Sequence, residues 1–346
     1  MTILRNALAA AAFSVASMGH ASATPDVVVS IKPIHSLVAA VMQGVATPDL
    51  IVEGAASPHT YSLRPSQARN LSDADIVFWV GHELEAFLEK PIETLGLNAR
   101  SVELIDAEGL GRLGFRAGAT FERHGHGDDD HDEHEHEEHG HSEDKLDHDD
   151  DDHKDHADDD HEYDHGHEEH AHGSPDPHVW LDPENARHML HEIADVLSDV
   201  DPANAARYEA NAETAMARLT ALGEEIEGLV APVRERPFVV FHDAYHYFEA
   251  RFGLHAAGSV TVSPETVPGA ARVREIQVRI RELSATCVFA EPQFMPKLIR
   301  VVTEGTEART GILDPLGASL EPGPDLYGAL LTDMASSFRT CLEPRS

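Results

Sequence analysis

Residues 201–232, DPANAARYEANAETAMARLTALGEEIEGLVAP, separate two halves of the chain that each alternate apolar strands with helices. Apolar residues recur in this stretch at alternating spacings of three and four, from Ala205 to Leu229. That spacing predicts one amphipathic helix of about 30 residues, roughly 43 Å long. We expect Asp201 to cap this helix, with a proline in its first turn, and Pro232 to end it.

A helix of this length is typical either of a coiled-coil dimer or of a spine between two lobes of one chain. In the first half we expect strands at 27–31, 50–52, 76–80 and 102–105, with helices at 32–41, 65–71, 84–95 and 183–198. In the second half we expect strands at 238–241, 257–262, 287–290 and 311–313, with helices at 245–252, 267–283, 296–304 and 326–342. This alternation predicts an α/β fold with two lobes, each holding a mainly parallel four-stranded sheet. The position of the long helix between them favours an inter-lobe spine and a monomer.

The first 23 residues have the pattern of a secretory signal peptide. Arg5 gives a positive start, residues 7–18 form a short apolar run, and residues 21–23 fit a small-residue cleavage site. The run is too short to span a bilayer, and no cysteine lies near the cleavage site to carry a lipid. We expect an exported protein of the bacterial periplasm without a membrane anchor. Its predicted parts are a signal peptide at 1–23, an N-terminal lobe at 24–200, the spine helix at 201–232 and a C-terminal lobe at 233–346.

The tract from residue 124 to residue 172 holds 15 of the chain's 25 histidines and 23 acidic residues against two lysines. It has too few apolar residues to offset the entropy of ordering its backbone, so we expect a disordered loop inserted in the N-terminal lobe. Acidic tracts of this kind are common as solvated spacers. Neutral imidazole is, however, a common ligand of zinc and copper, and the histidines favour metal capture.

The net charge of −36 argues against nucleic acid and against anionic membrane surfaces as partners. The chain has only two cysteines, Cys287 and Cys341. In an exported chain such a pair predicts a disulfide, and two free thiols acting as metal ligands are the alternative.

Three histidines lie beside turn signals at places where ligands gather in α/β proteins. His59 follows the second expected strand, His242 ends the first strand of the second half, and His178 follows the acidic tract. Ligands of open α/β sheets bind beyond the carboxyl ends of the strands, so these side chains can converge on one cleft between the lobes. His35 and His82 also follow strands; they are either auxiliary ligands or surface residues, and we favour the surface.

Five motifs together resemble one protein family. They are SPHTYSLRPS (57–66), DPHVWL (176–181), FHDAY (241–245), EPQF (291–294) and LDPLG (313–317). The family is that of the zinc-specific solute-binding proteins of bacterial ABC importers, the ZnuA type, and the resemblance covers essentially the whole mature chain. The family also has a His/acid-rich loop at this place and a disulfide that matches the two cysteines.

The resemblance implies that His59, His178 and His242 bind Zn²⁺. Some members carry a glutamate ligand directly before the first histidine, where this chain has Pro58, so the fourth position belongs to water or to another carboxylate. Asp314 matches a ligand of related members; a helix cap or a hydrogen bond to a histidine is the alternative for it. Three imidazoles with at most one carboxylate suit zinc.

The function implied is capture of Zn²⁺ in the periplasm and its delivery to an inner-membrane ABC permease, without catalysis. Two alternatives remain open on the residues alone. Three histidines and a water also describe a catalytic zinc site, although no recognisable general-base pattern accompanies the motifs. A periplasmic zinc buffer or chaperone would need the tract but not a two-lobed cleft.

Overall fold

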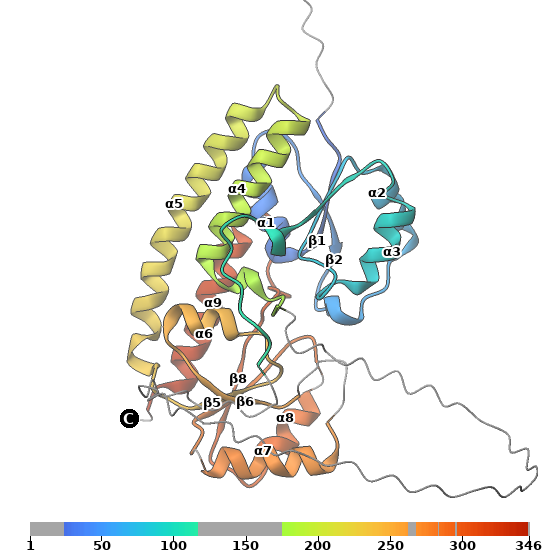
Figure 1. Cartoon of the computed structure of the whole chain (residues 1–346). Helices are drawn as coiled ribbons and strands as arrows, with labels where there is room; N and C mark the ends of the chain where they lie inside the picture. The colour runs from blue at the N-terminus through green and yellow to red at the C-terminus, as the bar shows by residue number, and fades with distance from the viewer. Residues whose placement is uncertain (1–23, 117–174, 262–267, 283, 295, 345–346) are drawn as a thin grey trace, which may run out of the picture.

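The computed structural model describes residues 24–116, 175–261, 268–282, 284–294 and 296–344. It contains two four-stranded sheets, one in each half of the chain, and all their strand pairs are parallel (Figure 1). The expected α/β fold of two sheet-and-helix lobes is confirmed. The expected signal peptide and the acidic tract lie outside the described residues.

The first sheet has the strand order β2-β1-β3-β4. Its central strands are buried at every residue because helices cover both faces of a parallel sheet. The elements of this half are β1 (Val27–Ile31), α1 (Lys32–Val41), β2 (Asp49–Val52), η1 (Pro58–Thr60), α2 (Pro65–Asp73), β3 (Ile76–Trp79), α3 (Ala86–Thr94), β4 (Arg100–Glu103), η2 (Leu104–Asp106), η3 (Val179–Leu181) and α4 (Pro183–Val200).

The second sheet repeats this topology with the order β6-β5-β7-β8. In each half, therefore, the first strand lies inside the sheet and the chain turns back across it to form the third. The elements of this half are η4 (Ala231–Val233), β5 (Phe238–Val240), α6 (His246–Phe252), β6 (Ala256–Ser259), α7 (Ala270–Glu282), β7 (Cys287–Ala290), α8 (Pro296–Thr303), β8 (Arg309–Ile312) and α9 (Leu326–Leu342).

The long helix α5 (Ala205–Val230) has 26 residues, about 39 Å at the rise of an α-helix. It runs along one side of the molecule and packs against α4, α1 and α9 (Figure 1). Its buried residues include Tyr208, Leu219 and Ile226, which belong to the predicted apolar stripe. The larger of two apolar clusters joins side chains from both sheets and from these helices, so the two lobes share this core. The smaller cluster packs α7 and α8 against the second sheet.

The expected cap of α5 is wrong. The helix begins at Ala205 after a turn. Asp201 instead directly follows α4 as its C-cap, and its backbone N–H bonds to the carbonyl of Leu197. The Asp201 carboxylate accepts hydrogen bonds from the Tyr208 hydroxyl at 2.9 Å and from the Asn204 amide at 2.7 Å. An aspartate before a proline often caps the helix that follows. Here the hydrogen bonds to Tyr208 and Asn204 occupy the Asp201 carboxylate instead.

The chain between β8 and α9 fastens the two halves to each other. The Lys32 ammonium, at the start of α1, donates to the carbonyls of Gly317, Ala318 and Leu320 at 2.9–3.0 Å. The Tyr327 hydroxyl on α9 donates to the carbonyl of Trp180 at 2.6 Å. These bonds hold the carboxyl end of the first sheet against the segment that leaves the second. No helix in the described part of the chain is long and apolar enough to cross a membrane.

The two cysteines form the predicted disulfide, which joins β7 to α9 across a sequence separation of 54 residues. We expect Cys287→Ser/Cys341→Ser to lower the free energy of unfolding by about 4 kcal/mol, the chain-entropy value for a loop of this size. Zinc affinity should change far less, because neither sulfur lies at the histidine cluster described below. Thermal unfolding and metal titration of parent and variant check this. Two titratable thiols in unreduced, denatured protein from the periplasm would contradict the pairing.

Candidate metal centre

Three histidines from distant parts of the chain meet between the two sheets. His59 lies in η1 after β2, His178 directly precedes η3, and His242 follows the end of β5. The possible ligand atoms of all three lie within 4.8 Å of one another. Their ring centroids are 5.2–5.9 Å apart. The structure thus brings together the three histidines that the strand ends and turn signals singled out.

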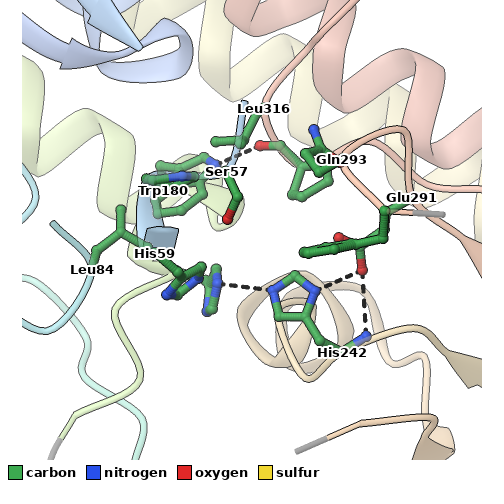
Figure 2. Close-up of a pocket in the computed structure, with 12 residues that line it drawn as sticks. Ser57, His59, Leu84, Trp180, His242, Glu291, Gln293 and Leu316 are labelled. Carbon is green, nitrogen blue, oxygen red and sulfur yellow. Dashed lines mark hydrogen bonds and ion pairs between the residues drawn. The ribbon is translucent and has the colours of Figure 1, made fainter. Parts of the chain in front are cut away.

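Two carboxylates determine which nitrogen each buried histidine presents. Asp176 Oδ1 lies 2.7 Å from His178 Nδ1, and Glu291 Oε1 lies 2.7 Å from His242 Nδ1. Each carboxylate accepts the ring N–H at Nδ1, so the other nitrogen, Nε2, is the one left to bind a metal. The two Nε2 atoms are 3.3 Å apart, and Figure 2 shows Glu291 bonded to one nitrogen of the His242 ring while the other nitrogen lies on the opposite side of the ring.

The space beside the histidines is small and mostly apolar. Its volume is about 10 Å³, which is room for one water-sized species. His178 and His242 are buried, and His59 is half-buried. The apolar lining includes Leu84, Trp180, Phe294 and Leu316 (Figure 2). A space of this size takes a single ion rather than an organic ligand.

The environment shifts the pKa values of the two buried imidazoles in opposite directions. Burial, reinforced by the neighbouring His242, holds the pKa of His178 well below the usual value for histidine. Burial also acts to lower the pKa of His242, but the carboxylate of Glu291 outweighs it, and the pKa of His242 is raised. Burial raises the pKa of Asp176 to about 7. His178 is therefore held in the neutral form, whereas His242 binds a proton more readily than an ordinary histidine.

Asp314, the candidate fourth ligand, is engaged in a turn. Its Oδ1 accepts from the backbone N–H groups of Leu316 and Gly317 at 3.1 Å and from Gln293 Nε2 at 2.9 Å. Its Oδ2 accepts from the N–H of Ala318 at 2.6 Å. Among the described residues, Asp314 is not in the group of possible ligands that lies within 4.8 Å, so the structure does not bring it to the cluster.

The two other candidate histidines, His35 and His82, lie outside the cluster. His82 is on the surface, as expected, beside Glu83 and Glu103. The surface position expected for His35 is wrong: this residue is 4% exposed in α1, and its Nε2 lies 3.0 Å from the carbonyl oxygen of Pro48. The hydrogen bond to that carbonyl permits its burial.

Asp176 and Glu291 belong to two of the five motifs, but the sequence alone assigned them no role. The position of Asp176 was informative, because a carboxylate two residues before a candidate metal-binding histidine can reach the ring of that histidine. Glu291 lies 49 residues from His242 and gives no local signal. Only the pairing of β5 with β7 brings it to the imidazole.

Comparisons with a family model and with individual relatives point to the same family. Residues 27–341 match the family described as "Zinc-uptake complex component A periplasmic" (ZnuA). The chain is 55% identical over 316 residues to a high-affinity zinc uptake system protein ZnuA of Brucella abortus (strain 2308), covering 91% of each chain. It is 42% identical over 335 residues to the protein of that name from Paracoccus denitrificans (strain Pd 1222), covering 96% of each.

Solved structures share the fold. A crystal structure of ZnuA aligns with a TM-score of 0.69 at 22% identity, covering 92% of this chain and 100% of that one. A 138–173 deletion mutant of ZnuA with zinc bound aligns with a TM-score of 0.67 at 22% identity, covering 93% and 100%. At this identity the likeness supports the two-lobed architecture alone.

We expect Glu291→Gln to weaken metal binding about 10- to 100-fold, the usual effect of losing a carboxylate that orients a ligating histidine. The amide is a poorer acceptor for the Nδ1 proton and lets the ring offer the wrong nitrogen. Chelator competition measures the affinity. Glu103→Gln, which alters a partly exposed carboxylate beside His82, is the control. Equal affinities of the Glu291 variant and the parent would show that the carboxylate does not orient the ligand.

Proposed function

Because this chain belongs to the ZnuA family of periplasmic zinc-uptake components, we propose that it captures Zn²⁺ with high affinity in the periplasm. It then delivers the ion to the inner-membrane permease of a zinc ABC importer. In this account zinc is cargo, bound and released unchanged. The family is one of solute-binding transport proteins, and its periplasmic location applies to this chain.

The observation that carries the proposal is the separation of the two buried Nε2 atoms. In a tetrahedral site with Zn–N bonds of about 2.0–2.1 Å, two ligating nitrogens lie roughly 3.3–3.4 Å apart. His178 Nε2 and His242 Nε2 are 3.3 Å apart, which matches this value. Little rearrangement of these two rings is then needed for zinc to bind.

We propose His59, His178 and His242 as the three protein ligands, with water or Asp314 in the fourth position. Asp314 already satisfies three backbone N–H groups, which favours water. The half-buried His59 is the ligand closest to solvent, so the ion enters and leaves on its side.

The carrier is favoured over the two alternative functions. A zinc hydrolase needs a free general base beside the metal-bound water. The carboxylates that contact the cluster, Asp176 and Glu291, are committed to the imidazoles. Saturable binding of one tight zinc ion, without hydrolysis of esters or peptides, separates a carrier from a hydrolase. Dependence of zinc uptake on the permease separates a carrier from a buffer.

We also propose roles for two segments outside the described residues, and an oligomeric state. Residues 1–23 are proposed to be a cleaved signal peptide, and the mature protein to act as a monomer. Residues 124–172 are proposed to gather additional zinc ions. Each of these binds more weakly than the cleft ion, because its ligands must be ordered as it binds.

Alanine at His59, His178 or His242 should lower zinc affinity by orders of magnitude while the protein stays folded. Each change removes one of the three proposed ligands. Competition with a chelator of known affinity measures the loss, and His191→Ala, on the exposed face of α4, is the control. We expect Asp314→Asn to cost far less than any of the three. A parent-like affinity in any histidine variant removes that residue from the ligand set.

Zinc affinity should be weaker at pH 5 than at pH 7.5, with protons taken up as zinc leaves. Ligating imidazoles must be neutral, so protons compete with zinc. The raised pKa of His242 makes this competition begin above the ordinary histidine value of about 6.5, whereas His178, with its lowered pKa, contributes little. Calorimetry in buffers of different ionisation enthalpy measures both quantities. A flat affinity over this interval would argue against a histidine site.

A further inference from the structure

The two ends of the chain around the acidic tract are fastened together beside the metal centre. Gly114 and Pro175 form an antiparallel bridge, and the N–H of Asp176 donates to the carbonyl of Leu113 at 2.8 Å. The Tyr247 hydroxyl of α6 accepts from the N–H of Leu113 and donates to the carbonyl of Asp176, both at 2.9 Å. We call residues 113–116 with 175–178 the stem. It ends at His178 and lies against α6.

Arg116, at the end of the stem, reaches across to two carboxylates of the second half. Its Nε donates to both oxygens of Asp243 at 3.0–3.1 Å, and its Nη2 also bonds to Asp243. Its Nη1 and Nη2 donate to Glu249 at 2.9 and 2.8 Å. The side chains of Arg116, Asp243 and Glu249 are only 18%, 9% and 2% exposed. The guanidinium therefore makes at least two hydrogen bonds to each of the two carboxylates in a largely buried position. We call this arrangement the fork.

Each partner in this fork connects to an element of the metal centre. Asp243 directly follows His242 in the bend after β5. Glu249 lies on α6 and also accepts from the N–H of Ala256 at 2.7 Å, where β6 begins. Through the stem, Arg116 belongs to the segment that carries His178. One guanidinium thus joins the backbones that carry two of the three proposed ligands.

We propose that Arg116 is a positioning residue: by joining the stem to Asp243 and Glu249, it fixes the separation of His178 and His242 and so prolongs the residence of zinc. This inference rests on the proposed function. The Nε2 atoms of His178 and His242 are 3.3 Å apart. The bonds of Arg116 to Asp243 and Glu249 join the two backbone segments that carry these rings.

The geometry requires arginine rather than any cation. A planar guanidinium can bind two carboxylates with paired donors, whereas an ammonium is a point charge without a fixed fork. Removing the cation alone would leave two buried carboxylates uncompensated, which is strongly destabilising. A test must therefore separate the loss of position from the loss of charge balance.

The test compares zinc dissociation rates, measured by chelator chase in a stopped-flow instrument, for the full-length chain and three variants. Arg116→Gln/Glu249→Gln removes one positive and one negative charge, so the buried net charge is kept while the fork is lost. Arg116→Lys keeps the charge and loses the fork. Arg112→Gln, whose pair with Asp106 is exposed, is the control in the same segment. Thermal unfolding of each metal-free protein reports stability separately.

We expect both Arg116 variants to release zinc about 10- to 100-fold faster than the parent, the range found when groups behind metal ligands are lost. The Arg112 variant should release zinc at the parent rate. A dissociation rate within about twofold of the parent in either folded Arg116 variant would overturn the inference. Loss of stability with no change in release would give the fork a purely structural role. If the histidine variants bind zinc normally, the proposed function itself fails, whatever these rates are.

Discussion

Two buried carboxylate–imidazole hydrogen bonds determine the geometry on which the metal centre depends. Asp176 and Glu291 each take the Nδ1 proton of a histidine at 2.7 Å, so the Nε2 atoms face each other. Burying two imidazoles side by side is unfavourable unless their polar atoms are satisfied. The carboxylates satisfy them and also select the tautomer. Hydrogen bonds that orient both rings reduce the cost of ordering them when an ion binds.

The fold brings these groups together by repeating one topology. In each half the first strand is central, and the carboxyl ends of the strands carry the chemical groups. His59 comes from the first sheet and His242 from the second, and His178 lies on the segment that returns to α4. The helices α5 and α9 and the bonds of Lys32 hold the two halves in one packed body. Histidines far apart in the sequence can meet only because this shared core fixes the two sheets.

Much of this architecture could be predicted from local patterns. The apolar runs and helical spacings predicted eight strands and the long helix, with ends displaced by a few residues, as for β4, which begins at Arg100 rather than at Val102. Strand ends and turn signals also singled out the three histidines. Residues whose role depends on tertiary partners were not predictable. Asp201 accepts from Tyr208 instead of capping α5, and His35 is buried through its bond to Pro48. Arg116 gave no sign in the sequence of its bonds to Asp243 and Glu249.

The central claim is that one zinc ion sits between His59, His178 and His242, bound through Nε2 of His178 and of His242. Anomalous diffraction at the zinc absorption edge, from crystals of the zinc-loaded protein, locates the ion directly. The account predicts one strong peak between the lobes, with a ring nitrogen of His59 and the Nε2 atoms of His178 and His242 each at about 2.0–2.1 Å. A peak that lacks any of these three ligands, or that is bound through Nδ1 of His178 or His242, would contradict it.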